Sequence, residues 1–456
     1  MSHRLGLALA VAILIGLAVL TLPGHLGEPR RGGAVAQAPT LTLGAPVGPA
    51  VTIGGHPIGL SIEYPQLAHD LGTRRCPPAA LVRTLAALGS PTVRIGGDSQ
   101  DTTAPAGTPP RAGVSDLPPG FWSRVACLER ETGVPIVVGL NLASGEVAWG
   151  AATAAGARAA IPGPRLSFEL GNEPDIYGSP VPWWNGHALV ASAMPLPTYL
   201  RRAEALEAML GRRNPVEGPD FASGRWTASV PMLARSLHLS TIDAHFYPLD
   251  ACRGSAGVTS FALLERAVQT KLDERVRLAR DARAAGLPAV ISETNSSSCG
   301  GAPGVSDTPA AAVWAVRMIL RALRAGFSSV RFHSSGGTYD PFVVTGGAVI
   351  QRPLYLGLRA AARVLAPGAV LRAIAGAGSL DGVTITGPGG GAATIVLSNY
   401  APTPKWVALS ARSRVRLVSI VARAPTVETS TATPLRGRVR VELPANSVAA
   451  ISAPRP

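Results

Sequence analysis

The feature that most constrains the fold is an alternation of short β-rich runs and helical segments over about 290 residues. Eight runs rich in β-branched and aromatic residues recur at 58–63, 92–96, 134–141, 166–170, 226–231, 241–247, 288–293 and 328–334. Most segments between them carry helical signals, for example 79–89, 120–132, 197–212, 259–286 and 309–325. Eight strands alternating with helices predict an α/β fold, a (β/α)8 TIM barrel over residues 55–352.

The pattern changes near residue 366, where helical periodicity gives way to short strands broken by Gly and Pro. Strands are expected at 382–385, 393–398, 415–421, 439–443 and 447–451. Residues 353–456 are therefore predicted to form a C-terminal all-β sandwich domain. We expect a further strand within residues 39–54 to join it. A chain of 456 residues exceeds the usual size of a single core, which agrees with a barrel plus a second domain.

Residues 1–38 have the composition of an export segment followed by a linker. Arg4 precedes a mostly aliphatic run from Leu5 to Leu22, and small residues follow at Ala34-Val35-Ala36. This order is typical of a secretory signal peptide. The aliphatic run is also long enough to serve as an uncleaved membrane anchor, so both alternatives stay open. In either case we expect the folded part to be secreted or held at the cell surface.

Four cysteines, Cys76, Cys127, Cys252 and Cys299, suit such an oxidising location as two disulfides. Four cysteines permit three pairings. We favour Cys76 with Cys127 and Cys252 with Cys299, because the second pair would tie together two loops that the barrel places side by side. The spacings match no zinc or redox pattern.

The net charge of +14 comes almost entirely from arginine. These arginines are scattered singly or in pairs, without a basic stripe interleaved with aromatic residues. Aromatic residues make up only 5% of the chain, which disfavours stacking on single-stranded nucleic acid. Two interpretations remain, a compositional bias on a solvated surface or a real attraction for polyanionic glycans. No nucleic-acid partner is expected.

Two glutamates stand where a short apolar run gives way to a turn. Glu173 follows the fourth predicted strand, and Glu293 ends the seventh. Reacting groups of (β/α)8 barrels gather at the carboxyl ends of the strands. Retaining glycosidases need two carboxyl groups about 5–5.5 Å apart, one to protonate the leaving oxygen and one to attack the anomeric carbon. Taken singly, each glutamate is equally well a structural turn residue, but their joint placement disfavours that alternative.

Further polar residues fall at the ends of the predicted strands: Glu63, Asp98, Asp101, Asn141, Asn172, His245, Tyr247, His333 and Tyr339. His245 and Tyr247 lie on one side of a strand, so they are either hydrogen-bonded core residues or residues that orient Glu293. We favour the second interpretation. The histidines do not cluster and no phosphate-binding glycine motif follows a strand, so the sequence predicts neither a metal nor an organic cofactor.

Several stretches resemble one family of retaining barrel glycosidases. They are Arg94 to Asp101, Gly139 to Leu142, His245 to Leu249, and Ser292 to Ser296 running into Gly300 to Asp307. Together with the Gly-Asn-Glu-Pro motif that contains Glu173, they are similar to glycoside hydrolase family 79, the β-glucuronidases and heparanases. The resemblance covers roughly residues 55–350.

The resemblance implies catalytic roles for two residues and supporting roles in the site for two more. Glu173 would be the acid/base and Glu293 the nucleophile. Asn172 would hold the sugar 2-hydroxyl, and Tyr247 would donate a hydrogen bond to the nucleophile.

It also implies how the sugar is held. Glu63 and Asp98 would line the sugar hydroxyls, although Asp98 stands where family members tend to carry a neutral amide or hydroxyl. The backbone amides of Gly300 and Gly301 and the hydroxyl of Tyr339 would bind the glucuronate carboxylate, since a glycine turn lets successive N–H groups converge on an anion.

The sequence therefore predicts an exported retaining glycosidase that cleaves β-linked glucuronic acid, or its 4-O-methyl form, from an oligosaccharide, polysaccharide or glycoconjugate. Two alternatives remain. One is the same barrel acting on a neutral sugar such as xylose or glucose. The other is a non-catalytic glycan-binding protein at the cell surface.

Overall fold

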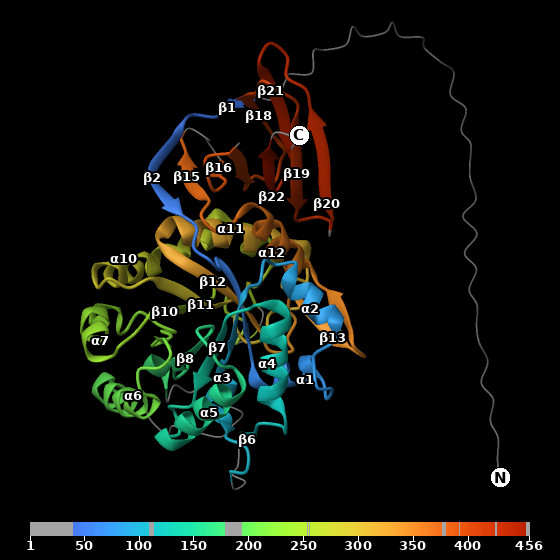
Figure 1. The fold of residues 1–456 in the computed structure, drawn as a ribbon. Coiled ribbons are helices and arrows are strands. Elements are labelled where there is room, and N and C mark those ends of the chain that lie inside the picture. The colour runs from blue at the N-terminus through green and yellow to red at the C-terminus, as the bar shows by residue number, and fades with distance from the viewer. Residues whose placement is uncertain are drawn as a thin grey trace, which may run out of the picture. The chain divides into compact units, whose positions relative to one another are not determined.

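The centre of the fold is a barrel of eight parallel strands (Figure 1). The computed structural model describes residues 40–452 apart from 109–113, 178–193, 253, 255, 376–379, 392 and 425. The barrel strands are β3 (Ile58–Ile62), β4 (Thr92–Ile95), β7 (Ile136–Leu140), β8 (Leu166–Leu170), β9 (Val216–Glu217), β10 (Ile242–Phe246), β11 (Ala289–Thr294) and β12 (Phe327–Ser334). Neighbouring strands follow the order β10-β11-β12-β3-β4-β7-β8-β9, and parallel bridges from Val216 to Leu239 and from Phe221 to Ala244 join the two edges. The predicted (β/α)8 barrel is confirmed.

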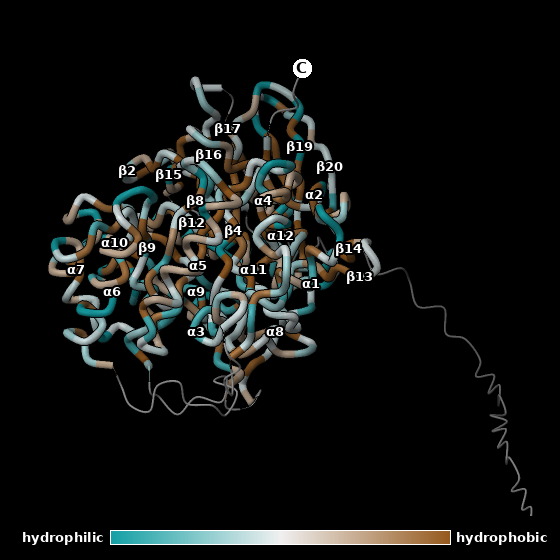
Figure 2. The backbone as a smooth tube through the Cα atoms, turned by 60° about the horizontal axis from the view of Figure 1, so that its bottom comes forward, coloured by the Kyte–Doolittle hydropathy of each residue, from teal (hydrophilic) through white to brown (hydrophobic). Residues whose placement is uncertain are grey.

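Helices surround the barrel because each buries one apolar face on the strands. They are α1 (Tyr64–Leu71), α2 (Ala79–Ala86), α3 (Asp98–Thr102), α4 (Phe121–Thr132), α5 (Val147–Ala160), α6 (Leu196–Leu210), α7 (Val230–Ser236), α8 (Ser260–Leu264), α9 (Arg266–Thr270), α10 (Val276–Ala284), α11 (Pro309–Ala325) and α12 (Pro353–Val364). In α11 the buried ring of Trp314 packs edge-on against Phe332 of β12. Figure 2 shows apolar segments gathered inside the molecule and hydrophilic segments mostly outside.

Two predicted elements of the barrel are wrong. The run 226–231, expected as the fifth strand, forms the 3-10 helix η2 (Thr227–Ser229) and the start of α7, whose first turn contains Pro231. The real fifth strand, β9, is only two residues long and ends in a glutamate, so it shows no apolar run. The predicted helix 259–286 is divided into α8, α9, η3 (Lys271–Arg275) and α10, because Glu265 is extended between α8 and α9.

Two β-sheets form the C-terminal domain, and their strand pairs are antiparallel apart from the pair β1 and β18. The seven-stranded sheet has the order β2 (Pro46–Thr52), β15 (Val370–Ile374), β16 (Leu380–Thr386), β17 (Ala393–Asn399), β22 (Ser447–Ser452), β19 (Val415–Val421), β20 (Val427–Ala432). The three-stranded sheet has the order β1 (Thr40–Thr42), β18 (Lys405–Ser410), β21 (Arg438–Leu443), with β1 pairing parallel to β18. Side chains from both sheets, among them Leu397, Leu417, Val407 and Val441, form a separate apolar core. The predicted barrel with an all-β domain is confirmed.

The barrel and the β domain pack together through α11 and α12 (Figure 1). The buried Arg317 of α11 donates hydrogen bonds to the carbonyls of Leu264 and Asn399, and its guanidinium lies 4.0 Å from the ring centre of Tyr400. Two short hairpins complete the fold, β13 (Phe342–Thr345) with β14 (Ala348–Gln351), and β5 (Thr103–Ala104) with β6 (Ser115–Asp116).

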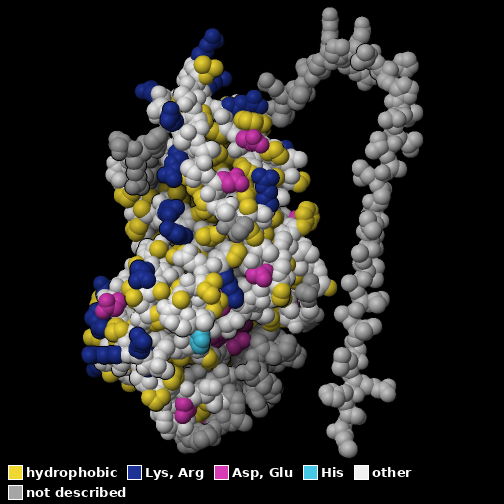
Figure 3. All heavy atoms as spheres, turned by 90° about the vertical axis from the view of Figure 1, so that its right-hand side faces the viewer, with side chains coloured by type: hydrophobic (Ala, Val, Ile, Leu, Met, Phe, Trp, Pro, Cys, Tyr) yellow, Lys and Arg dark blue, Asp and Glu magenta, His cyan; other side chains and the backbone are white. Residues whose placement is uncertain are grey.

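Both disulfides have the favoured pairing, Cys76 with Cys127 and Cys252 with Cys299. The expected signal peptide or anchor at residues 1–38 lies outside the described residues. Within the described part of the chain, no helix combines the length and apolar character needed to cross a membrane. Figure 3 shows arginine and lysine side chains scattered over both the β domain and the barrel on one face, mixed with apolar and acidic groups.

Candidate active site

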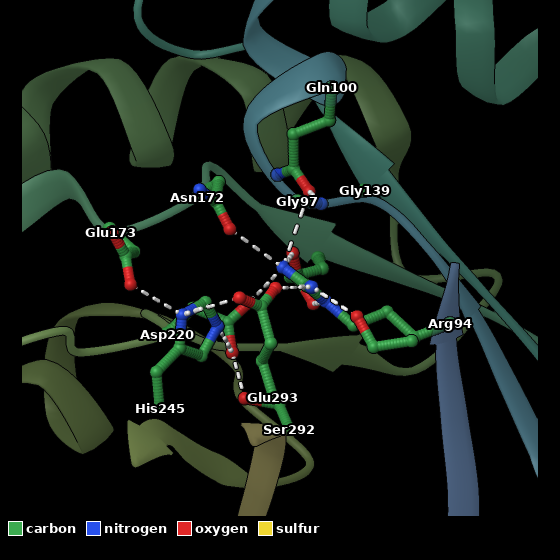
Figure 4. Close-up of polar contacts among 12 residues, drawn as sticks. Arg94, Gly97, Gln100, Gly139, Asn172, Glu173, Asp220, His245, Ser292 and Glu293 are labelled. Carbon is green, nitrogen blue, oxygen red and sulfur yellow. Dashed lines mark hydrogen bonds and ion pairs between the residues drawn. The ribbon is translucent and has the colours of Figure 1, made fainter. Parts of the chain in front are cut away.

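The two predicted carboxylates meet at the carboxyl end of the barrel. Glu293 lies on β11, while Glu173 directly precedes the 3-10 helix η1 (Pro174–Ile176) that follows β8. One oxygen of Glu173, one oxygen of Glu293 and one ring nitrogen of His245 lie within 4.8 Å of one another. Figure 4 shows these three side chains converging beside Arg94. Two glutamates that are 120 positions apart in the sequence thus lie close enough to act on the same bond of a substrate.

Glu293 is surrounded by groups that favour its ionised form. Its Oε1 accepts a hydrogen bond from the Tyr247 hydroxyl at 2.7 Å, and its Oε2 accepts one from Arg94 Nη1 at 2.7 Å. His333 Nδ1 lies 3.3 Å from Oε2. Burial alone would raise the pKa of Glu293, but His333, His245 and Arg94, together with the Tyr247 hydrogen bond, outweigh it and lower that pKa to about 2. Glu293 is therefore a carboxylate at neutral pH.

Glu173 has a different environment. Its φ of 50° is uncommon for a residue with a side chain, and such conformations cluster at functional sites. Oε1 contacts His245 Nδ1 at 2.8 Å. Burial raises the pKa of Glu173 and the charge of Glu293 adds to the rise, although His245 acts against both. The pKa values of the two carboxyl groups are therefore shifted in opposite directions, and Glu173 is the one that retains its proton.

His245 lies between the two carboxyl groups. It stands opposite Glu293 in the register of β10 and β11. Nδ1 lies 2.8 Å from Glu173 Oε1 and 3.8 Å from Glu293 Oε1. The residue that it orients by a hydrogen bond is therefore Glu173, and Tyr247 serves Glu293 instead.

The buried guanidinium of Arg94, at the end of β4, organises the site. It binds Glu169 of β8 in a bidentate pair, Nε to Oε2 at 2.5 Å and Nη2 to Oε1 at 2.7 Å. It also donates to Asn172 Oδ1 at 2.9 Å and approaches Asp220 Oδ2 at 3.2 Å. Arg94 belongs to one of the stretches that carry the family resemblance, but no role was predicted for it, and Glu169 and Asp220 were missed. Arg94 and Glu169 lie near the carboxyl ends of their strands, which was their only signal in the sequence, and Asp220 had no such signal.

The Asn172 side chain connects Arg94 with the pocket. Its Nδ2 donates to Asp98 Oδ1 at 3.2 Å. Burial raises the pKa of Asp98 well above its ordinary value, and the nearby Glu63, Glu173 and Glu293 raise it further. A protonated Asp98 is neutral, which agrees with the amide or hydroxyl expected at this position from the family resemblance.

Glu63 is held by the first turn of α3. Its two carboxylate oxygens accept hydrogen bonds from the backbone N–H groups of Asp98 at 3.1 Å and Ser99 at 2.9 Å, and from the Ser99 hydroxyl. His333 Nε2 lies 3.3 Å from Oε1. Asp101 and Asn141 are different, because they bond to each other and to the loop at Leu142, and therefore act as structural residues.

The segment predicted to bind a sugar carboxylate lies on one wall of the pocket. Cys299, Gly300 and Gly301 all have positive φ, of 53°, 81° and 87°. The Gly301 N–H already donates to the Ser298 carbonyl at 3.3 Å. The buried Tyr339 places its hydroxyl 3.2 Å from Ser335 Oγ. Gly300 and Tyr339 line the pocket, whereas Gly301 supports the turn behind it.

The pocket has a volume of about 940 Å³. Four carboxyl side chains line it, from Glu63, Asp98, Glu173 and Glu293, together with His69 and His333. The described residues that line it include no lysine and no arginine. The disulfide Cys252–Cys299 forms part of its rim. The net positive charge of the chain is therefore not concentrated in this pocket.

Two groups of side chains have a spacing that suits a metal ion, Glu173 with His245 and Glu293, and Glu169 with Asp220 and Asp243. Arg94 forms ion pairs with Glu293, Glu169 and Asp220. A cation at either place would compete with this guanidinium, so the donor sets fit an arginine better than a metal.

No protein-family model matches the chain, and no curated protein matches it in sequence. Solved structures similar in fold are glycoside hydrolases. A 4-O-α-L-rhamnosyl-β-D-glucuronidase from Fusarium oxysporum 12S has a TM-score of 0.69 and 18% identity, covering 91% of this chain and 100% of that one. A family 51 arabinofuranosidase from Xanthomonas axonopodis pv. citri has a TM-score of 0.65 and 14% identity, covering 91% and 98%.

The catalytic domain of a family 30 xylanase C from Talaromyces cellulolyticus has a TM-score of 0.55 and 13% identity, covering 91% of this chain and 99% of that one. At these identities the likeness establishes the fold alone, a (β/α)8 barrel with a β domain. The resemblance to family 79 in particular stays a prediction.

Proposed function

We propose that the chain is a retaining glycosidase that works by double displacement, with Glu293 as nucleophile and Glu173 as acid/base. One observation carries the proposal. Two carboxyl groups approach within 4.8 Å at the barrel rim while their pKa values shift in opposite directions. A proximity of about 5 Å is what retention requires, and opposite shifts separate the acid from the nucleophile.

In the first step Glu293 attacks the anomeric carbon as a carboxylate. The bond between that carbon and the leaving oxygen breaks, and Glu173 transfers its proton to the leaving oxygen. A glycosyl ester of Glu293 results. In the second step Glu173, now ionised, takes a proton from water while the water oxygen attacks the anomeric carbon, which releases Glu293 and restores both groups.

The surrounding side chains support these two reaction steps. Arg94 and Tyr247 hold the Glu293 oxygens in place and keep them charged. His245 holds the oxygen of Glu173. Asn172 does not itself line the pocket, but its Nδ2 donates to Asp98, which does. From there the amide would donate to a sugar hydroxyl as positive charge develops on the ring.

For the substrate we propose a β-linked glucuronic acid or its 4-O-methyl form. The fold neighbour that acts on a rhamnosyl-glucuronic acid unit and the motif resemblance both support this choice. Gly300 and Tyr339 would bind the sugar carboxylate, with Ser335 beside them. Backbone amides and hydroxyls are able to bind a single anion without a lysine or arginine.

A neutral sugar is the second candidate, and one observation favours it. Carboxyl groups line the pocket, Glu293 among them is ionised, and no lysine or arginine lines it in the described chain, so an anionic sugar is less well compensated there than a neutral one. The same observation disfavours densely sulfated chains inside the pocket. We also propose secretion or cell-surface location, which the two disulfides support.

The test is a panel of nitrophenyl glycosides given to the wild type, Glu293→Gln and Glu217→Gln. Glu217 is a buried barrel carboxylate that does not line the pocket, so its variant is the matched control. We expect wild type and control to hydrolyse the β-glucuronide and Glu293→Gln to hydrolyse nothing. Turnover of the β-xyloside or β-glucoside alone would establish the neutral-sugar alternative. No turnover of any glycoside would favour the non-catalytic glycan-binding alternative.

A further inference from the structure

A buried aspartate, Asp220, lies beneath both catalytic carboxylates and contacts neither. It follows β9 in the segment where the sequence shows no strand, and it is 0% exposed. Its φ of 53° belongs to a conformation that side-chain-bearing residues seldom adopt. A strained backbone conformation persists only where the surrounding structure enforces it, and such residues cluster at functional sites.

The two oxygens of Asp220 face different partners. Oδ2 lies 3.2 Å from Arg94 Nη2. Oδ1 lies 3.5 Å from His245 Nε2, an ion-pair distance, and accepts a hydrogen bond from the Ser292 hydroxyl. Figure 4 shows Asp220 between the arginine and the histidine.

Each of these two partners of Asp220 also contacts one of the catalytic glutamates. Arg94 Nη1 donates to Glu293 Oε2 at 2.7 Å, and His245 Nδ1 lies 2.8 Å from Glu173 Oε1. Building on the proposed function, we propose that Asp220 is a positioning residue that holds the proton of the Glu173–His245 pair in place. Among the described residues, Glu293 also forms ion pairs with both Arg94 and His245, but it lines the pocket, whereas Asp220 does not.

Charged and titratable groups from five elements face Asp220 or share its partners: Arg94 on β4, Glu169 on β8, Tyr199 on α6, Asp243 and His245 on β10, and Glu293 on β11. Burial would raise the pKa of Asp220, but Arg94, Glu169 and His245 together outweigh the effect of burial and lower that pKa. The residue therefore stays ionised. Burial would lower the pKa of His245, but Glu293, Asp220 and Glu173 raise it well above its ordinary value.

Removal of the Asp220 charge should act mainly through His245. Glu169 binds Arg94 with two hydrogen bonds of its own, so the guanidinium stays anchored without Asp220. His245 would lose an anionic partner, its pKa would fall, and the Glu173–His245 pair would give up its last proton at a lower pH. The basic limb of the pH profile reports that proton, because Glu173 must carry it for the first step.

The experiment compares pH profiles of kcat/KM for the wild type, Asp220→Asn and Glu217→Gln on the glycoside that the wild type hydrolyses fastest. Glu217 belongs to β9, three residues before Asp220, and pairs with Arg331 at 2.7 Å, outside the pocket. For Asp220→Asn we expect a loss of about 10- to 100-fold at the optimum and a basic limb displaced to lower pH by about one unit. Glu217→Gln should keep the wild-type limbs.

A purely structural role would lower kcat/KM equally at every pH. Unmoved limbs in a folded Asp220→Asn variant, or equal displacement in Glu217→Gln, would overturn the proposal. If the wild type itself hydrolyses no glycoside, the proposed function fails instead, and the two failures stay distinguishable.

A second variant covers the case in which Asp220→Asn does not fold. Ser292→Ala keeps the Asp220 charge and removes the hydroxyl that shares Oδ1 with His245. Asp220 should then hold His245 more strongly, so the basic limb should move to higher pH, opposite to the first variant. A limb that stays in place or moves to lower pH in Ser292→Ala would contradict the assigned role.

Discussion

The barrel interior contains two buried arginine clusters whose partners differ. At the rim, Arg94 hydrogen-bonds to Glu169, Glu293 and Asn172 through all three of its nitrogens. Deeper in the barrel, Arg331 of β12 forms an ion pair with Glu217, while its Nε and Nη1 have no hydrogen-bond partner among the described residues. Both oxygens of the neighbouring Asp243 likewise have none.

The difference separates a cluster that fixes geometry from one that only balances charge. A guanidinium with every donor engaged holds its acceptors in one arrangement, as a catalytic carboxylate requires. A guanidinium with unused donors still neutralises a buried carboxylate but does not define its direction closely. Equivalent substitutions should therefore affect catalysis at the rim and stability in the deeper cluster.

The largest expected effect comes from the same change in each cluster. Glu293→Gln removes the nucleophile, and we expect kcat to fall by about 10⁴-fold or more. Glu217→Gln leaves Arg331 unpaired, and we expect a loss of about 3–5 kcal/mol in the free energy of unfolding with kcat/KM nearly unchanged. Steady-state kinetics and urea unfolding of both variants measure this. A comparable loss of kcat in the two would erase the distinction.

The next effect sharpens the roles within the rim. Glu173→Ala removes the acid, so hydrolysis of alkyl glycosides should fall by about 10²- to 10⁴-fold. Aryl glycosides with a very acidic leaving group need no proton and should keep their first step. A burst of nitrophenol before slow turnover is the expected signature. Equal losses on aryl and alkyl glycosides would show that the roles of Glu173 and Glu293 are wrongly assigned.

Arginine replaced by lysine gives a smaller and more specific contrast. Arg94→Lys cannot make the paired hydrogen bonds to Glu169 while also holding Glu293, so we expect about a 10²-fold loss in kcat/KM. In the wild type the pKa of about 2 for Glu293 means that activity falls only as the pH drops through that value. Arg94→Lys should move this acid limb to higher pH, whereas Arg331→Lys should leave it in place. Profiles of kcat/KM between pH 3 and 8 distinguish the two, because an acid limb enters this range only if the pKa of Glu293 has risen from about 2.

The two disulfides should give the smallest effects. Cys252–Cys299 forms part of the pocket rim, while Cys76–Cys127 joins the segment before α2 to α4 and lines no part of the pocket. Replacing the first pair with serines should raise KM by several-fold, and replacing the second should lower only Tm. A KM change in the second pair alone would reverse this assignment.

Much of the barrel is visible in the sequence because most of its strands are apolar runs buried on both faces. The strand β9 was missed because its two residues, which end in Glu217, form no apolar run. The run of aromatic and β-branched residues near Trp226 was predicted to be the fifth strand instead. In the β domain, β15, β18 and β20 were not among the strands expected. Each is short, and a charged residue stands inside β15 and β20 and at the start of β18.

The candidate site was predictable where turn motifs mark strand ends, as at Glu173 and Glu293. Roles that depend on which side chain reaches which neighbour were not. Asp220 carries no motif, and its importance follows only from contacts to Arg94 and His245 across the barrel. His245 was expected beside Glu293, and strand register alone did not show that its ring lies closer to Glu173 than to Glu293.

The most direct test of the central claim is the configuration of the first-formed sugar. Hydrolysis of a β-glycoside by the wild type, followed by proton NMR from the first minutes, records the anomer before mutarotation. Two carboxyl groups this close leave no room for a water molecule on the opposite face of the sugar, so we predict the β-anomer as the initial product. Initial release of the α-anomer would contradict the double displacement by Glu173 and Glu293.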